Sequence, residues 1–141
     1  MLPSEVRVGW IFRYSYLWHW QHLQGQEEGA KDRPCLVLAL VMMTEEGTPV
    51  VRVLPITHTP PAGDTIGIEI PSRVRQVLGL DDAPSWVIVS EFNVDAWPNA
   101  GLTPIPGRPG IFSYGFMPPG LFARIKARFL KLATQSHGVQ R

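Results

Sequence analysis

Near the start of this chain, aromatic side chains occupy every second position from residue 10 to residue 20, and the positions between them hold both apolar and polar residues. A period of two places them on one face of an extended strand. Eleven residues exceed the usual length of a strand in a small barrel, so we expect a strand near 9–16 followed by a bend into a loop. The first aromatic residues then belong to the core and the last are exposed. The core set is Trp10, Phe12 and Tyr14, and the exposed set is Trp18 and Trp20.

Four further stretches have the composition of strands. The runs 35–43 (CLVLALVMM) and 49–56 (PVVRVLPI) are joined by a short segment that contains Gly47, which predicts a hairpin. Residues 66–70 and 85–92 predict two more strands. The Pro- and Gly-rich region 98–120 predicts an irregular path with one or two short strands.

Two stretches have helical patterns. Residues 72–79 predict a short helix with Ser72 as its N-cap and Gly79 at its C-terminal end. After residue 120 no proline follows, and apolar residues recur at helical spacing. These residues are Leu121, Phe122, Ile125, Phe129 and Leu132.

Together the patterns predict a mainly β fold with minor α: a small barrel of about five to seven short, mostly antiparallel strands, a short internal helix and a C-terminal helix. The length of 141 residues indicates a single domain over 1–141. We expect a barrel core over about 9–95, a basic irregular segment and helix over about 96–134, and a loose tail over 135–141.

Composition narrows the class of protein. One cysteine, Cys35, excludes an internal disulfide framework and a cysteine-rich zinc site. The longest apolar run, 35–43, has nine residues, far short of the ~20 that span a membrane. The first ten residues lack the pattern of a secretory signal. These observations predict a soluble, cytoplasmic protein with no membrane partner.

The net charge of +1 excludes a binder of nucleic acid that is strongly basic throughout. Charge is nevertheless segregated, because residues 1–95 hold 7 basic and 12 acidic groups while residues 96–141 hold 6 basic and no acidic ones. The basic third is either a solvated helix face with a loose tail, or a contact for phosphate or an acidic partner.

The common catalytic motifs are absent, and the histidines show no metal-binding spacing, so we expect neither a metal nor a cofactor. Polar groups instead collect where apolar strands begin or end. Pro34 keeps Arg33 extended at a strand entrance, where a guanidinium can grip a phosphate; the alternative is an ion pair with Asp32 or Glu28. Thr57 and His58 follow the run 49–56, where hydroxyl groups serve either a site or the turn backbone.

Two more polar groups complete the candidates. Glu91 and Asn93 lie near the end of the run 85–92, where an unpaired carboxylate is costly to bury, and an ion pair with Arg33 would remove that cost. Trp18 and Trp20 flank His19, in a stretch that also carries His22. Exposed aromatic rings among polar groups either stack on nucleobases or pack on a neighbouring subunit.

These residues match a known pattern in its order and spacing. The matching elements are Gly9-Trp10-Ile11, then Lys31-Asp32-Arg33-Pro34 leading into a strand, then Val53-Leu54-Pro55-Ile56-Thr57, then the strand that ends at Glu91. In residues 9–95 the chain resembles the PemK/MazF family of toxins from bacterial type II toxin–antitoxin systems. The motifs Trp97-Pro98, Tyr114-Gly115-Phe116 and Pro118-Pro119 are similar to a PemK-like branch.

The resemblance implies an SH3-like barrel, a homodimer, and a metal-independent endoribonuclease that cleaves single-stranded RNA by attack of a ribose 2′-OH on the adjacent phosphate. It also implies a cognate antitoxin with an acidic, disordered tail. By match, Arg33 stabilises the phosphate and assists protonation, and Thr57 positions the scissile group. We expect the catalytic residues to be Arg33, Thr57, Glu91 and His58, and the substrate-binding residues to be Trp18, His19, Trp20, His22, Lys31 and Asn93.

One departure from the family pattern affects the mechanism. Many relatives carry Gln near the place of Glu91, and a carboxylate there repels phosphate unless it acts as a base or pairs with Arg33. An ion pair with Arg33 would make the chain an inactive relative. The alternative function is a non-catalytic SH3-like barrel that binds an antitoxin peptide or nucleic acid. A third is an unrelated small β-domain with a structural or assembly role.

Overall fold

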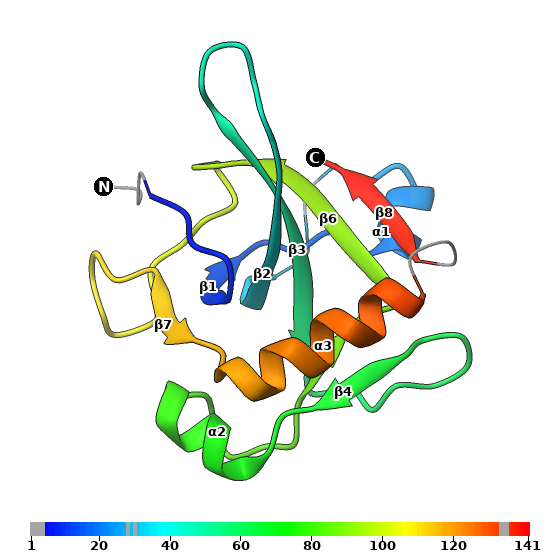
Figure 1. The fold of residues 1–141 in the computed structure, drawn as a ribbon, viewed down its shortest axis with the longest axis vertical. Helices are drawn as coiled ribbons and strands as arrows, with labels where there is room; N and C mark the ends of the chain where they lie inside the picture. The colour runs from blue at the N-terminus through cyan, green and yellow to red at the C-terminus, as the bar shows by residue number, and fades with distance from the viewer. Residues whose placement is uncertain (1–4, 28, 30, 133–135) are drawn as a thin grey trace.

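The computed structural model describes residues 5–27, 29, 31–132 and 136–141. Within this part the chain forms eight strands and three helices, which confirms the prediction of a mainly β fold with minor α (Figure 1). In chain order they are β1 (Trp10–Tyr14), α1 (His19–Leu23), β2 (Arg33–Met43), β3 (Pro49–Thr57), β4 (Gly67–Glu69), α2 (Ser72–Leu78), β5 (Trp86–Ile88), β6 (Glu91–Ala96), β7 (Ser113–Phe116), α3 (Pro119–Lys131) and β8 (His137–Gln140).

The strands form one sheet in the order β4-β5-β3-β2-β1-β7, with β6 paired to both β3 and β8. All neighbours are antiparallel except β6 and β8, which are parallel. Among the described strands none joins β7 to β4, so the sheet is open rather than closed into a complete cylinder. β3 lies at the branch point and pairs with β2, β5 and β6.

Successive side chains of a strand point to opposite faces of the sheet, and here a core cluster covers each face. On one face Leu36 and Leu54 pack with Ile125 of α3, which crosses the sheet in Figure 1. On the other face Cys35 and Val37 pack with a second cluster that includes Phe12, Tyr14, Tyr16 and Trp97. The alternating aromatic row therefore fills a core, as predicted, and Trp10 packs against the same cluster from a half-buried position.

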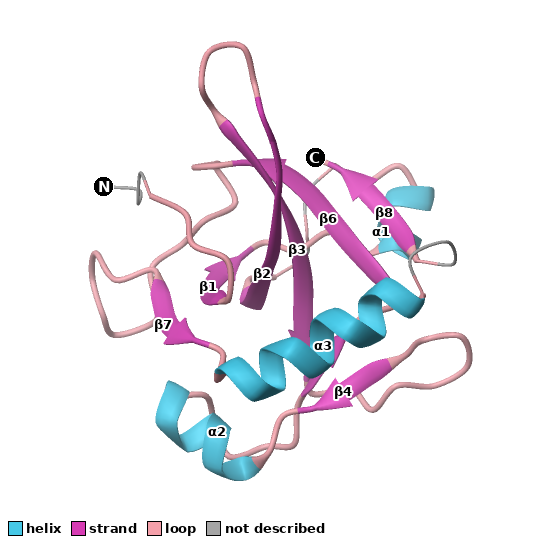
Figure 2. Ribbon diagram, viewed as in Figure 1, coloured by secondary structure: helices cyan, strands magenta, loops and turns pink. Residues whose placement is uncertain are grey.

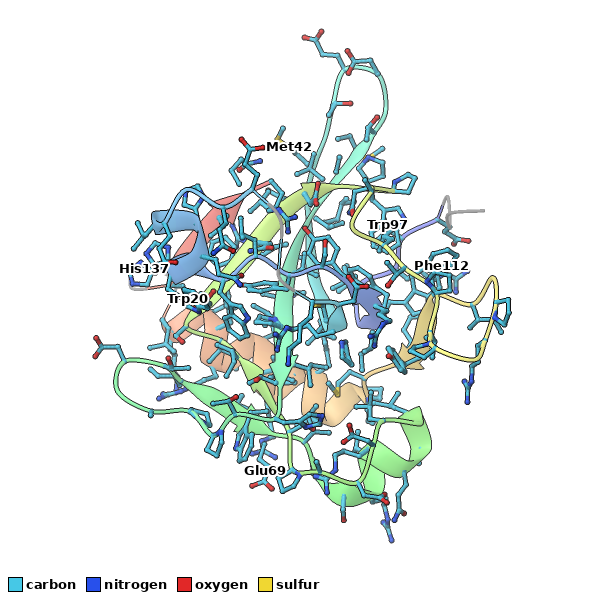
Figure 3. All side chains as sticks on the ribbon, turned by 180° about the vertical axis from the view of Figure 1, so that it is seen from behind. Trp20, Met42, Glu69, Trp97, Phe112 and His137 are labelled. Atoms are coloured by element: carbon cyan, nitrogen blue, oxygen red, sulfur yellow. The ribbon has the colours of Figure 1, made fainter. Side chains whose placement is uncertain are left out.

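The hairpin of β2 and β3 extends well beyond the rest of the molecule (Figure 2). β2 bulges twice against β3 in this region, between residues 37 and 39 and between 40 and 42. Four successive apolar side chains of β2 are each between 43% and 56% exposed there. They are Leu40, Val41, Met42 and Met43, of which Met42 is labelled in Figure 3.

Three local predictions need correction. The expected loop after the first strand contains α1, whose first turn is closed by a hydrogen bond from the Trp18 N–H to Oε1 of Gln21 (3.0 Å). The predicted strand 85–92 is interrupted between β5 and β6. The N-cap of α2 is Pro71 and not Ser72, while Gly79 ends the helix in the left-handed conformation as predicted.

The tail predicted to be loose is ordered from residue 137, since β8 pairs with β6 and buries Val139. Arg141 anchors its end by donating hydrogen bonds to the hydroxyl of Tyr14 (2.8 Å) and the carbonyl of Ser15 (2.9 Å). Residues 133–135, which include the first residue of the predicted tail, lie outside the described part of the chain. None of the described helices could span a bilayer, since the longest, α3, has 13 residues.

Candidate active-site groove

A groove of about 770 Å³ opens where β2 begins and β3 ends. Its walls come from the start of β2 and the residues before it, the end of β3 and the loop that follows, the region of α1, and the first residue of β6. Seven of the ten predicted site residues line it, which brings together residues far apart in the sequence. They are Trp18, Trp20, Lys31, Arg33, Thr57, His58 and Glu91.

Arg33 and Thr57 occupy matching positions on neighbouring strands. Arg33 is the first residue of β2 and Thr57 is the last of β3. The β2–β3 register pairs Cys35 with Pro55, and its continuation by two residues along each strand places Arg33 opposite Thr57. Because directly opposite residues point to the same face of a sheet, a cation and a hydroxyl group meet at the groove wall.

Arg33 is half-buried, and no described carboxylate lies within ion-pair distance of it. Its guanidinium lies over the ring of Trp18, 4.9 Å from the ring centroid. Its Nε atom is buried without a hydrogen-bond partner among the described residues. The ion pair with Asp32 considered from the sequence is not formed, and residue 28 is outside the described part. Burial lowers the pKa of this guanidinium below its ordinary value, as expected for a cation whose solvation is reduced.

Thr57 is buried, and its Oγ1 accepts a hydrogen bond from the backbone N–H of Thr59 (3.1 Å). The hydroxyl therefore serves the turn backbone, which was one of the two roles considered. A hydroxyl group can accept and donate at once, so its proton remains available to an acceptor in the groove.

The ring of His58 is held at the groove rim by two polar contacts. Its Nε2 lies 2.8 Å from a carboxylate oxygen of Asp81, and its Nδ1 lies 3.1 Å from the carbonyl oxygen of Pro84. Both partners are acceptors, so each ring nitrogen must carry a proton for both hydrogen bonds to form. Both ring nitrogens of His58 are therefore engaged by protein acceptors at the rim, and neither is free to face a substrate in this geometry.

Glu91 does not pair with Arg33, contrary to one of the two expectations for this residue. Its Oε1 instead accepts hydrogen bonds from the hydroxyl of Tyr16 (3.1 Å) and the backbone N–H of His19 (2.9 Å). Burial raises the pKa of this carboxyl group, and the two hydrogen bonds oppose that rise. The cost of burying the carboxylate is thus reduced first by two neutral donors and to a smaller extent by the nearby His137.

The two tryptophans at the groove differ in exposure. Trp18, predicted to be exposed, is half-buried between Tyr16, whose ring it meets edge-on at 5.1 Å, and the guanidinium of Arg33. Trp20 is 55% exposed, as predicted, and offers a free aromatic face. Lys31 is also exposed at the groove. Trp20 is therefore the better platform for a stacked base.

Three predicted substrate-binding residues lie outside the lining of the groove. His19 stacks on His137, with ring centroids 4.4 Å apart. Figure 3 shows His137 and Trp20 on the same side of the molecule. Burial and the two nearby histidines, His137 and His22, lower the pKa of His19. His22 is exposed and faces a second depression beside Arg141.

Asn93 is the third, and it is fully buried. Its side chain donates to the carbonyl of Leu17 (2.8 Å) and accepts from the Leu17 N–H (2.9 Å) and from Arg141 (3.0 Å). These bonds join β6 to the segment before α1 and to the C-terminal residue, so the role of Asn93 in the fold is structural.

Among the described residues of the basic C-terminal third, Ile105, Pro106 and Tyr114 reach the groove and no charged side chain does. Sequence reasoning missed Arg13, which lines the groove and lies opposite Pro34 in the β1–β2 register. A signal was present, because Arg13 is the one charged residue of an otherwise aromatic and apolar strand. Asp81 and Tyr16 carried no such signal.

The described residues hold no cluster of three or more His, Cys, Asp or Glu side chains that suits a metal ion. Comparison with known proteins gives no further guide: no protein-family model matches the chain, and neither a curated protein nor a solved structure is detectably similar to it.

Proposed function

We propose that the groove binds single-stranded RNA and cleaves it by attack of a ribose 2′-OH on the adjacent phosphate, as the toxin component of a type II toxin–antitoxin system. The observation that carries this proposal is the half-buried guanidinium of Arg33, without a described carboxylate partner, opposite the hydroxyl of Thr57 in a groove. Such a pair suits an anion held by a planar donor and a hydroxyl group.

The main requirement of this reaction is that the protein stabilises the negative charge on the phosphate in the transition state. Its transition state is crowded and more negative at the non-bridging oxygens, which favours fixed donors over mobile ones. Arg33, held by Trp18, and Thr57, held by the turn, are both positioned before substrate binds. Trp20 offers a face on which an unstacked base can lie, the usual way in which proteins bind single-stranded RNA.

Two protein partners belong to the same proposal. The first is a second copy of the chain, for which the exposed apolar run at Leu40–Met43 offers a surface. The second is an antitoxin whose acidic, disordered tail would compete with RNA for Arg13, Lys31 and Arg33 in the groove. Sedimentation of the pure chain, alone and with a candidate antitoxin, measures both associations.

The central test is cleavage of long single-stranded RNA by the pure protein with chelator present. Arg33→Ala and Thr57→Ala should each abolish cleavage while the protein remains folded. Two matched controls exist. Arg52 is also half-buried over an aromatic ring, that of Phe92 at 4.5 Å, and Thr44 also accepts a hydrogen bond from a nearby backbone N–H (3.0 Å). Neither lines the groove.

The variants Arg52→Ala and Thr44→Ala should therefore keep the activity of the wild-type protein, whatever they cost in stability. Failure of the wild-type protein to cleave any of several long RNAs would contradict the proposal. Salt-sensitive RNA binding without cleavage would support the non-catalytic alternative instead.

A further inference from the structure

Glu91 is anchored at one carboxylate oxygen and free at the other. Oε1 accepts both hydrogen bonds, from the Tyr16 hydroxyl and from the His19 N–H. No described residue donates to Oε2, and Glu91 lines the groove together with Arg33 and Thr57. A carboxylate fixed in this way presents one unoccupied basic atom in a constant orientation.

Tyr16 is well placed to hold that orientation. It is buried, and burial together with the neighbouring Glu91 raises its pKa well above the ordinary value, so it remains a protonated donor. Its ring packs edge-on against Trp18, which carries the guanidinium of Arg33 on its face. One packed set of side chains thus connects the carboxylate of Glu91 to the cation proposed to hold the phosphate.

The other candidate bases in the groove are less suited. Both ring nitrogens of His58 are occupied by Asp81 and Pro84, and Asp81 is itself engaged by that ring. Asp32 lines the groove, but no hydrogen bond from a described residue orients its carboxylate. Asp81 is also held by a neutral donor, the Ala83 N–H, but its two oxygens are then both occupied, one by Ala83 and one by His58. Among the described groove carboxylates, Glu91 combines a fixed orientation with an unoccupied oxygen.

We propose that Glu91 is the general base of the cleavage reaction and that Tyr16 is its positioning residue. This inference rests on the proposed function. Oε2 takes the proton from the 2′-OH as the bond from the 2′-oxygen to phosphorus forms. The bond from phosphorus to the 5′-oxygen breaks, and that oxygen takes a proton from water. The hydroxide left behind removes the proton from Glu91, which restores the carboxylate.

The first experiment compares Glu91→Gln with the wild-type protein in RNA cleavage and binding. Gln keeps the shape and the acceptor oxygen but cannot take up the proton. We expect cleavage to fall by about 100-fold or more, as for loss of a general base, while RNA binding stays equal or becomes tighter because a negative charge is removed. Asp32→Asn is measured in parallel, and we expect it to leave the acidic limb of the pH–rate profile in place.

The second experiment uses Tyr16→Phe, which removes only the donated hydrogen bond. The titratable groups packed around Glu91 are Tyr16, His19 and His137, and both histidines remain in this variant. Loss of the bond should raise the pKa of Glu91, so its NMR titration and the acidic limb of the pH–rate profile should both move to higher pH. Tyr14→Phe is the matched control, because Tyr14 is equally buried but bonds to Asp95 (2.6 Å) and Arg141.

These experiments distinguish the roles of Glu91 and Tyr16 from RNA cleavage itself. Wild-type rates in Glu91→Gln would overturn the role of the base while RNA cleavage itself stood. An unchanged titration of Glu91 in Tyr16→Phe, measured without RNA, would overturn the positioning role. Absence of RNA cleavage by the wild-type protein would refute the proposed function and the base with it. If the titration of Glu91 and the pH–rate profile shift together in Tyr16→Phe, and neither shifts in Tyr14→Phe, both roles are supported.

Discussion

The guanidinium of Arg33 lies 4.9 Å from the centroid of the Trp18 ring, and its buried Nε has no described hydrogen-bond partner. Contact with an aromatic face is worth roughly 0.5–2 kcal/mol and keeps a planar cation parallel to the ring or close to it. The terminal nitrogen atoms of Arg33 are then directed by a rigid ring. Trp18, predicted as a platform for bases, instead positions the cation.

This relationship predicts that charge alone will not replace Arg33. Arg33→Lys keeps a cation but loses the planar fork and its fit to the Trp18 face, so we expect RNA cleavage to fall by about 100-fold, the usual cost of removing one transition-state donor. Arg52→Lys, on the other face of the sheet, should change the rate little. A rate for Arg33→Lys within about threefold of wild type would show that only a point charge is needed.

The two contacts of His58 at the groove rim predict that replacing this residue changes stability and cleavage only slightly. His58→Gln loses at least one of the hydrogen bonds to Asp81 and Pro84, both at the exposed rim. We expect the unfolding free energy in urea to fall by less than about 1 kcal/mol, and cleavage to fall by less than about tenfold with an unchanged pH profile. Loss of one limb of that profile would instead assign His58 a role in proton transfer.

The spacing of apolar and aromatic residues and the positions of the prolines predicted many of the strands and helices. The alternating row identified Phe12 and Tyr14 as core, and the hairpin over 35–56 and the C-terminal helix follow directly from their patterns. Arg33 and Thr57 were predicted to act together, which stays a prediction. Both line the groove, and the β2–β3 register, continued by two residues beyond its Cys35–Pro55 pair, brings them opposite one another. Arg33 begins β2 and Thr57 ends β3, so the sequence pattern that predicts the two strands also predicts where these residues lie.

The contacts that the sequence did not indicate are long-range. Tyr16 reads as one more core aromatic residue, and only the fold brings its hydroxyl to Glu91, 75 positions away. Asn93 and β8 depend on each other, because Arg141 reaches the Asn93 side chain only once β8 pairs with β6. Such partners have no signature in composition or spacing. A polar residue in an apolar run indicates that a partner exists, but not which one.

The buried bonds of Asn93 predict that its main role is in stability. Asn93→Ala leaves the N–H and carbonyl of Leu17 without their side-chain partner and removes an acceptor from Arg141. We expect a loss of about 2–4 kcal/mol in urea-induced unfolding, since buried polar groups are left unpaired. Asn99→Ala is the control, because Asn99 makes two similar bonds in a half-buried turn and should cost about 1 kcal/mol. Equal losses would show that burial at Asn93 carries no extra penalty.

The separation of the basic third from the groove predicts which cations RNA cleavage needs. Arg124 and Arg128 are exposed on α3 and form no ion pair among the described residues. The double variant Arg124→Glu/Arg128→Glu should therefore cleave a short RNA at the wild-type rate. Lys31→Glu, in the groove, should weaken binding of the same RNA and reduce its salt dependence. A large loss of short-RNA cleavage in the α3 variant would place the helix at the site after all.

The raised pKa of Glu91 predicts that this residue lowers stability at neutral pH. The folded protein holds its proton more tightly than the unfolded chain, in which Glu titrates near pH 4.3, so the folded state binds more protons between the two pKa values. The contribution of Glu91 to stability therefore falls as pH rises through that window. Glu91→Gln removes this dependence while its amide oxygen still accepts from Tyr16 and His19. Its unfolding free energy relative to wild type should increase from pH 4 to pH 7, whereas Glu69→Gln, at an exposed position on β4, should show no such trend. A difference that stays constant or decreases with pH would mean that the folded state stabilises the ionised carboxylate, and that Glu91 is not held at the expense of stability.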